Sequence, residues 1–410
     1  MNTHYDAIII GAGPAGSTAA ILLAQAGWSV ALVEKLAFPR RKVCGECIAA
    51  PNLALLHALG IGVDFDKLAG PALKKVALMS GDKTIIANLP ALAGNDYPWG
   101  RALGREYLDT LLLERAKSVG ATVLQPWFVR AIEGEPGNFH CAAKTENTNE
   151  AITLTTPLVI AAHGSWELAP EERKQSRQPH KASDLFAFKA NFRHSKLTPG
   201  LLPVLAFNGG YGGMVLGDHG MTTLACCIRR DTLSACRQSM RLGTAAACVE
   251  AYLKESSTGI ASALENAEPE GAWLSVGPIR PGVRINKHSK HLLIGNAAGE
   301  AHPIIGEGMS MAMQSAWLLG EMLIAQRTTL HSASAYQSLQ RDYTRQWQHH
   351  FAPRIRLAAV FAHIAMRPWL ASAAMPLLQR WPRLLTLGAR WSGKISATVT
   401  PNHYHSGRTA

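Results

Sequence analysis

Acidic residues are missing from the end of this chain. No aspartate or glutamate occurs after Asp342, whereas basic residues continue at Arg345, Arg354, Arg356, Arg367, Arg380, Arg383, Arg390, Lys394 and Arg408. The formal net charge of +12 is therefore concentrated toward the C-terminus. Such a charge suits nucleic acid, an anionic membrane surface or an acidic ligand, and its sign alone does not choose among them.

Long apolar runs and a leader pattern are also missing. The longest apolar stretches, Leu357 to Met366 and Trp369 to Leu378, are separated by Arg367 and Pro368. Neither reaches the roughly 18 to 20 residues that a spanning helix needs. The opening residues, MNTHYDAIII, lead directly into a buried-strand pattern, and the seven cysteines are an odd number. We therefore expect a cytoplasmic protein with free thiols.

Charged residues are few, at 17%, while hydrophobic residues make up 47%, so a disordered chain is excluded. Strand, glycine turn, helix and strand follow one another from Tyr5 to Lys35, and short β-like runs fill about Ala182 to Leu274. This order predicts a discontinuous nucleotide-binding lobe (1–75, 101–181 and 275–330), a substrate lobe built on an antiparallel sheet (76–100 and 182–274) and a helical C-terminal region (331–410).

A glycine motif predicts a dinucleotide site. Gly11, Gly13 and Gly16 form G-x-G-x-x-G after a strand and at the start of a helix, whose N-terminal N–H groups can receive a pyrophosphate. Glu34 ends the second strand, where an acidic residue binds ribose hydroxyls. Ala15 in the turn and Lys35 beside Glu34 complete this first set of candidate cofactor residues.

Two distant segments, LLIGNAAGEAHPIIGEG and ALGREYLDTLLLERAKSVGA, resemble the group A flavoprotein monooxygenases, including their geranylgeranyl-reductase-like branch. The resemblance implies FAD, held by a glutathione-reductase-type Rossmann lobe with an inserted antiparallel β-sheet lobe and a helical C-terminal cap, an α/β fold. It implies further cofactor residues, which are Arg105, Gly295, Asn296, Pro303, Gly306, Gly308 and Met309. Asn296 stands where the family has aspartate, and His163-Gly164 stands where it has Asp-Gly.

The segment KVCGEC carries two cysteines at C-x-x-C spacing, Cys44 and Cys47. A zinc site needs a second pair of ligands, and no other C-x-x-C or suitable H-x-x-x-H occurs, so no metal is predicted. In the geranylgeranyl-reductase-like branch, a basic-x-Cys-Gly-Glu segment lies along the flavin. The resemblance therefore implies that Cys44 and Gly45 lie beside the ring and that Arg41, or Arg40, neutralises the cofactor's phosphate or ribityl oxygens. The alternative that Cys44 and Cys47 form a disulfide during turnover is left open.

Three residues are candidates for catalysis. His302 precedes Pro303 in the predicted flavin loop, Cys44 would lie beside the ring, and Tyr211 lies within GGYGG, Gly209 to Gly213. That glycine-rich run is interpreted either as a wall of the substrate cavity or as a plain hairpin, and both interpretations stay open. His163 and His219 are weaker candidates, because a single histidine is more often structural.

The C-terminal region also has two interpretations. Apolar and basic residues alternate from Phe351 to Trp391 with several tryptophans. The region is either a helical cap over the core or a surface that lies on an anionic bilayer, which would make the protein membrane-associated. Nucleic acid is the least favoured partner of this basic region, because the sequence contains no recognised nucleic-acid-binding fold.

The resemblance implies a monooxygenase that uses NAD(P)H and O2 to hydroxylate a hydrophobic, aromatic or polyketide-like substrate through a flavin C4a-hydroperoxide. NAD(P)H would bind transiently, because there is no second glycine-rich nucleotide motif. Alternatives are a geranylgeranyl-reductase-like enzyme that saturates an isoprenoid double bond, and a flavin-binding accessory protein without turnover. A flavin halogenase is disfavoured, since the Trp-x-Trp-x-Ile-Pro signature is absent.

Overall fold

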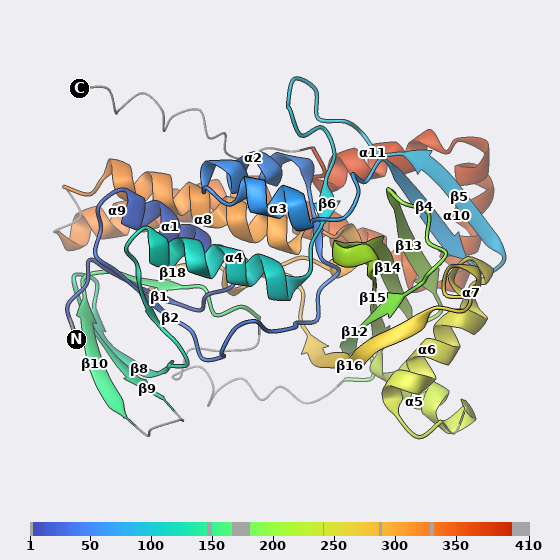
Figure 1. Ribbon diagram of the computed structural model, residues 1–410, viewed down its shortest axis with the longest axis horizontal. Helices are drawn as coiled ribbons and strands as arrows, with labels where there is room; N and C mark the ends of the chain where they lie inside the picture. Colours follow the sequence, from blue (N-terminus) through green and yellow to red (C-terminus); the bar gives the residue numbers. More distant parts are fainter. Residues whose placement is uncertain are drawn as a thin grey trace.

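The computed structural model describes residues 3–145, 150–165, 181–240, 242–286, 289–328 and 332–395. Figure 1 shows one lobe around a parallel sheet, which is the predicted nucleotide-binding lobe, a second lobe around a larger sheet, and C-terminal helices along both. The α/β fold class expected from the sequence is confirmed. Residues 166–180 of the predicted nucleotide lobe and residues 396–410 of the predicted helical region lie outside the described residues.

The nucleotide lobe contains a five-stranded sheet in which every pairing is parallel. Its spatial order is β18 (Leu292–Leu293), β11 (Val159–Ala161), β1 (Ala7–Ile10), β2 (Val30–Val33) and β7 (Thr122–Leu124). Helix α1 (Pro14–Gln25) connects β1 to β2, and α4 (Arg105–Ser118) leads into β7. The predicted βαβ unit is therefore present, with Pro14 in the first helical turn, where its missing N–H costs nothing.

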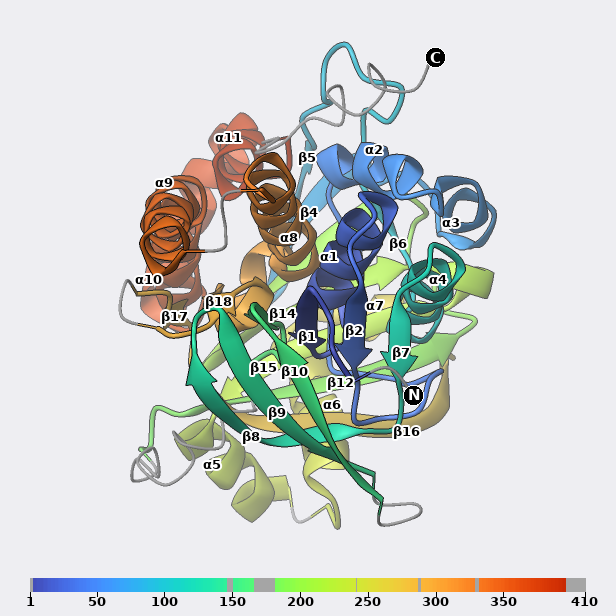
Figure 2. The same ribbon diagram turned by 90° about the vertical axis from the view of Figure 1, so that its left-hand side faces the viewer.

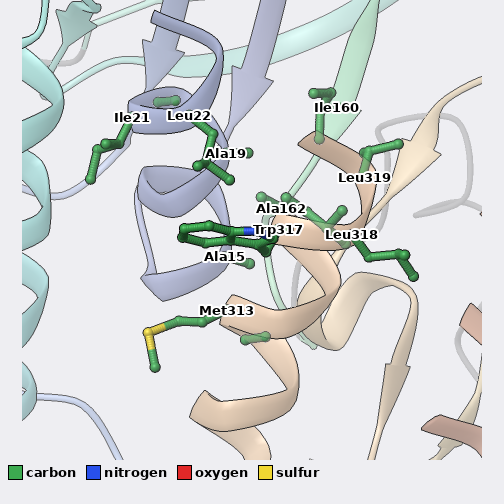
Figure 3. Packing of buried hydrophobic residues seen from close by; sticks show 14 of the residues in the cluster. Ala15, Ala19, Ile21, Leu22, Ile160, Ala162, Met313, Trp317, Leu318 and Leu319 are labelled. Atoms are coloured by element: carbon green, nitrogen blue, oxygen red, sulfur yellow. The ribbon is translucent and has the colours of Figure 1, made fainter. Parts of the chain in front are cut away.

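Helix α8 (Gly308–Ala325) packs against α1 and closes the core of this lobe. Figure 3 shows Trp317 of α8 between the two helices, close to Ala15 and Ala19 of α1. Small residues on α1 leave room for the indole, and Trp317 is 1% exposed. This packing fixes α1 and α8, and so the two glycine-containing loops that precede them.

The second lobe is built on a seven-stranded sheet. Its order is β16 (Glu268–Ile279), β12 (Leu185–Arg193), β15 (Thr222–Arg229), β14 (Gly210–Leu216), β13 (Leu201–Phe207), β4 (Lys75–Ser80) and β5 (Lys83–Asn88). Neighbours are antiparallel except β13 and β4, which pair in parallel. The early strands β4 and β5 thus complete a sheet whose other strands come from 185–279.

Smaller elements surround these sheets. Figure 2 shows a three-stranded antiparallel sheet in front, below the parallel sheet. The remaining strands and short helices are β8 (Phe128–Glu135), β9 (Asn138–Lys144), β10 (Ala151–Thr156), the pair β3 (Cys47–Ile48) and β6 (Arg101–Ala102), the pair β17 (Gly282–Val283) and β19 (Gly299–Glu300), η1 (Asp218–Gly220), η2 (Gly295–Ala297) and η3 (Pro303–Ile305).

The two faces of the large sheet are covered differently. Cys226 packs in a core with α5 (Arg230–Met240), α6 (Ala245–Ser256) and α7 (Thr258–Ala263), whereas the adjacent Cys227 packs in a core with α9 (Ala333–Ala365). Successive residues of a strand point to opposite faces, so this separation is the expected one. Helices α2 (Ala50–Ala58) and α3 (Gly62–Leu68) cover the nucleotide lobe instead.

The C-terminal region is helical, with α10 (Pro368–Arg380) and α11 (Arg383–Ser392) following α9. The chain bends by 100° between α9 and α10, at the break that Arg367 and Pro368 predict. Within the described ranges, no single helix is long and apolar enough to cross a membrane. The bent pair α9 and α10 meets that test only when both helices are counted together.

Candidate functional site

The first glycine turn borders open space at one position only. A Cβ atom added to Gly16 would lie 1.8 Å from the carbonyl oxygen of Gly11, and one added to Gly11, at φ +102°, would lie 2.6 Å from the carbonyl oxygen of Ala162. At Gly13 the nearest atom would be Nη2 of Arg105, at 3.8 Å. Gly13 therefore leaves room above the N-terminus of α1, where no side chain caps the N–H groups and an anion can bind.

Arginine side chains surround this space. Arg105 donates to both carboxylate oxygens of Asp109, from Nε at 2.8 Å and from Nη2 at 2.7 Å, and both side chains are buried. Arg40 Nη2 lies 3.3 Å from Glu34 Oε2 and 3.8 Å from Asp109 Oδ2. The two carboxylates hold the two guanidinium groups in place beside the glycine turn, with N–H donors left for phosphate oxygens.

Lys42 adds a third cation at the same place. Its Nζ would lie 3.9 Å from a Cβ added to Gly164, at the carboxyl end of β11. Burial, together with the nearby charges of Arg105 and Arg40, lowers the pKa of Lys42 from 10.5 to about 8. A cluster of cations that repel one another in this way is suited to a ligand that carries two negative phosphates.

The shifted pKa gives a testable pH dependence. A bound diphosphate stabilises protonated Lys42 and raises its pKa, so cofactor affinity is full below pH 8 and falls as the pH rises through 8. We expect dissociation constants for FAD to increase roughly tenfold between pH 7 and pH 9. Fluorescence titration with FAD at each pH measures this change. The Lys42→Met variant is expected to bind more weakly with little pH dependence, and an equal slope in both proteins would contradict the role of Lys42.

Glu34 lies at the turn itself. It is 4% exposed, and its carboxylate accepts hydrogen bonds from the backbone N–H groups of Ala12 and Leu36, both at 2.9 Å. This anchors the carboxylate between Gly11 and Gly13, at the end of β2. Lys35 is exposed beside it. Contacts of Glu34 and Lys35 with a ribose remain predictions from the sequence.

The segment that leads into α8 contains the second set of glycines, and it lies close to the first glycine turn. Gly295 has φ +59°, and a Cβ added there would lie 3.0 Å from the Cβ of Ala15. Ala15 is therefore a packing residue that lets the two loops approach each other. Asn296 donates from Nδ2 to Ser165 Oγ at 2.8 Å, which orients its amide at the carboxyl end of β11.

The loop then turns into α8. Pro303 begins η3, and Gly306 adopts the left-handed conformation at φ +60°. Gly308 begins α8, and a Cβ added to it would meet no atom within 4 Å. Met309 is 5% exposed and packs in the core of the nucleotide lobe. Open space therefore lies at the N-terminus of α8 as well as α1, as a long dinucleotide requires.

The Cys-Gly-Glu segment forms the junction between the lobes. Glu46 has φ +57° and is 3% exposed. Its carboxylate accepts from the backbone N–H of Arg105 at 2.9 Å, from Thr223 Oγ1 at 2.6 Å and from the fully buried Lys189 Nζ. A Cβ added to the neighbouring Gly45 would meet no atom within 4 Å. Contacts from both lobes thus hold the segment in place, and open space lies beside Gly45.

Lys189, which the sequence pattern did not predict as a site residue, is the buried partner of Glu46 at this junction. It lies in the middle of β12, in the apolar run LFAFKANF. A single lysine in a strand that is otherwise buried requires an acidic partner, and this was the available signal. The partner Glu46 is 143 residues away, so the pattern alone did not identify it.

Both thiols of the C-x-x-C spacing are free, as are the other five. Cys44 Sγ accepts from the backbone N–H of Glu46 at 3.3 Å. Burial raises the pKa of the Cys47 thiol, so it stays protonated and packs as a small side chain. Lys394, which follows α11, donates to Cys47 Sγ at 3.6 Å and to the carbonyl oxygen of Gly306 at 3.3 Å, and it pairs with Glu307 at 3.0 Å. The C-terminal region is therefore tied to the loop before α8.

Two candidate catalytic residues meet beside a pocket. Tyr211 Oη and His302 Nδ1 share a hydrogen bond of 2.9 Å, although the residues are 91 positions apart. His302 also lines a pocket of about 310 Å³ whose apolar walls include Leu185, Ile279 and Met366. The pocket lies between the large sheet, the loop around His302 and the break between α9 and α10. Its volume suits a small ligand.

The environment keeps this pair neutral. Burial and the neighbouring His363 lower the pKa of His302 from 6.5 to about 4. Burial raises the pKa of Tyr211 well above 10. Neither group changes charge near neutral pH, so the pair can relay a proton without leaving a buried charge only if it takes up one proton as it gives up another.

Other predicted residues lie elsewhere. Arg41 points toward β16, where Nη1 is 3.4 Å from the carbonyl oxygen of Ala272, so of the two neighbouring arginines Arg40 lies at the glycine turn. His219 is exposed in η1. The glycines of GGYGG permit close packing of a hairpin, since a Cβ at Gly210 would lie 2.1 Å from the ring of Phe207. Within the described ranges, no group of three or more potential metal ligands occurs.

Comparisons with known proteins give a family match over most of the chain. Residues 4–346 match the family described as "FAD binding domain". The chain is 26% identical to conditioned medium factor receptor 1 of Dictyostelium discoideum, over 97% of this chain and 76% of that protein. It is 24% identical to menaquinone reductase of Mycolicibacterium smegmatis, over 96% and 93%.

The fold is similar to that of the myxobacterial chondrochloren halogenase CndH, with a TM-score of 0.75 and 17% identity over 95% of this chain and 91% of that one. The family match includes the glycine turn, Arg105 and the loop before α8, and these are the elements that leave room for a dinucleotide among cations. The chain is therefore an FAD-dependent flavoprotein, and it belongs to the FAD-binding-domain family of the group A flavoprotein monooxygenases.

Proposed function

We propose that this flavoprotein is a monooxygenase that uses NAD(P)H and O2 to hydroxylate a hydrophobic aromatic substrate in the pocket beside His302. The Tyr211–His302 pair carries the proposal. A phenol reacts with an electrophilic oxygen donor after it gives up its proton, and the hydrogen-bonded Tyr211–His302 pair, which stays neutral, can relay that proton onward. Saturation of an isolated double bond adds a hydride and a proton, so there the same pair would have to act as a proton donor.

The chain's own residues would bind and orient the substrate. Leu185, Ile279 and Met366 provide apolar walls, while Asp184, Arg229 and Arg367 line the same pocket with charges of both signs. This combination suits a molecule with a large apolar part and one polar end. Bound FAD would supply electron transfer and oxygen activation, and the residues of the glycine turn and of the loop before α8 would hold it.

The test follows oxygen and product together. The purified yellow protein is mixed with NADH or NADPH and an alkyl-substituted phenol, while an oxygen electrode and mass spectrometry record the reaction. The proposal predicts that substrate accelerates flavin bleaching and that the product gains one oxygen atom per O2 consumed. Bleaching followed by release of hydrogen peroxide alone, for every phenol, would contradict it. Failure of both nicotinamides to bleach the flavin would favour an accessory protein without turnover.

Removing the tyrosine hydroxyl tests the proton relay. We expect Tyr211→Phe to lower the turnover of a phenolic substrate roughly a hundredfold, as loss of general acid–base catalysis does. The rate at which NAD(P)H bleaches the flavin is expected to stay unchanged, since that step uses no substrate proton. His219→Gln, outside the pocket, is the matched control. Equal loss of both rates in Tyr211→Phe would point to a structural defect instead.

A second candidate is saturation of an isoprenoid double bond, and the similarity to menaquinone reductase over nearly the whole chain favours it. The two reactions differ in their need for oxygen. Under anaerobic conditions, with NADPH and a prenylated quinone, a reductase yields a product that keeps two more hydrogens after its quinol form has been reoxidised to the quinone. A hydroxylase yields none, so this single comparison separates the candidates.

A further inference from the structure

We infer that the outer face of α10 and α11 is a docking surface for an anionic lipid bilayer. The docking face is defined by six exposed apolar side chains, Trp369, Leu377, Trp381, Leu384, Leu387 and Trp391. The three tryptophans are 69%, 55% and 61% exposed, and they are the only exposed tryptophans of the described residues. Tryptophan at such exposure is costly in water and favourable at a membrane interface.

The inner face of these helices is already occupied. On α11, Leu385 and Ala389 pack against the core beside Cys47, and Thr386 donates to the carbonyl oxygen of Asn88 at 2.7 Å. On α10, Ala371 and Met375 are buried. One side of α10 and of α11 therefore packs on the core. The docking face lies on the other side of these helices, which does not take part in that packing.

Helical spacing gathers the docking face into stripes. Leu384, Leu387 and Trp391 lie at i, i+3 and i+7 of α11, and such residues lie on one side of a helix. Trp369 and Leu377 lie two turns apart on α10. Figure 1 shows α10 and α11 at the edge of the molecule, next to β4 and β5. Neither helix spans a bilayer, so its apolar stripe would lie in the interface plane.

The charge of this region selects the partner. Arg380, Arg383 and Arg390 are exposed beside the stripes, and no acidic residue follows Asp342 anywhere in the chain. Lipid phosphates pair with arginine, whose apolar stem can lie along the membrane surface. A second copy of the chain would instead place arginines against arginines without carboxylates. An anionic bilayer is thus the occupant that matches both the apolar and the charged groups.

The position of the surface also suits the pocket. Met366 and Arg367 line the pocket at the break before α10, and Trp369 lies two residues after Arg367. A bilayer on the docking face would lie close to the pocket and could supply a hydrophobic substrate. This last step depends on the proposed function, whereas docking itself does not.

Sedimentation with vesicles tests the docking face without turnover. The FAD-loaded protein is mixed with vesicles of phosphatidylcholine alone or of equal parts phosphatidylcholine and phosphatidylglycerol. We expect binding to the anionic vesicles only, weakened by raised salt. Trp369→Ser/Trp381→Ser/Trp391→Ser is expected to lower the partition coefficient about a hundredfold. Arg380→Gln/Arg383→Gln/Arg390→Gln is expected to do the same, since each arginine contributes about fivefold.

Controls separate docking from misfolding and from general stickiness. Val63→Ser/Leu242→Ser removes exposed apolar side chains elsewhere and is expected to bind like the original protein. Arg130→Gln/Arg237→Gln/Arg341→Gln also removes three exposed arginines and is the matched charge control. Each variant is accepted only if it retains FAD. Any one of four results would overturn the proposal. The first two are protein that stays in the supernatant with anionic vesicles and protein that binds both kinds of vesicle equally. The other two are binding of both docking-face variants as strong as that of the original protein and a dimer that the tryptophan variant dissociates.

Discussion

Arg105→Met is expected to release FAD and to destabilise the protein at the same time. Arg105 donates twice to Asp109, which is completely buried, and its Nη2 is the nearest atom to the space above Gly13. Removing the guanidinium leaves a buried carboxylate without its main partner, which costs about 3 kcal/mol of unfolding free energy. Thermal unfolding of the FAD-free protein measures this loss, and FAD titration measures the loss of the phosphate contact.

A second variant separates the two roles of Arg105. Arg105→Met/Asp109→Leu removes the stranded carboxylate as well, and replacement of a buried ion pair by apolar side chains is often neutral. We expect the double variant to regain most of the stability but not the affinity for FAD. If affinity returned together with stability, Arg105 would act only through the fold.

Glu46→Gln is expected to have the largest effect on stability. The variant leaves Lys189, which is fully buried, without a negative partner and weakens the bond from Thr223. Loss of one member of a buried ion pair costs about 3 to 5 kcal/mol. Denaturant unfolding of the FAD-free protein measures the change. Glu46→Gln/Lys189→Met is expected to recover much of it, because both charges are then removed.

The matched control for this pair lies at the surface of the same sheet. Arg193 and Glu270 form an ion pair at 2.7 Å, and their side chains are 50% and 46% exposed. Glu270→Gln is expected to change the stability little, because solvent screens exposed pairs. Equal effects of Glu46→Gln and Glu270→Gln would show that the Glu46–Lys189 pair is not the buried junction between the lobes.

The parts of the fold that were predicted from the sequence depend on local rules. A strand, a glycine turn and a helix follow from spacing and sterics within thirty residues, and Gly11 and Gly16 are required by contacts that any side chain would violate. The break at Arg367 and Pro368 likewise follows from proline geometry, and α9 ends at Ala365. These features needed no knowledge of distant partners.

The rest depends on contacts between segments far apart in the sequence. Tyr211 and His302 were each candidates, but only the fold brings them within 2.9 Å. The pairs Glu46–Lys189 and Glu307–Lys394 join residues from different lobes, and nothing local identifies a partner. The parallel pairing of β13 with β4 also escaped prediction, because periodicity indicates a strand but not its neighbour.

The central claim is that the dinucleotide lies on the first glycine turn, and Gly13 offers the most direct test. A Cβ at Gly13 has no protein atom closer than 3.8 Å, so Gly13→Ala is expected to fold normally while its methyl group enters the phosphate space. Gly243→Ala is the control, since no atom lies within 4 Å of its added Cβ. The measurement is the equilibrium dissociation constant for FAD. We predict an increase of at least about tenfold for Gly13→Ala, with unchanged thermal unfolding of the FAD-free protein, and none for Gly243→Ala. Equal FAD affinity in Gly13→Ala and the original protein would contradict the account.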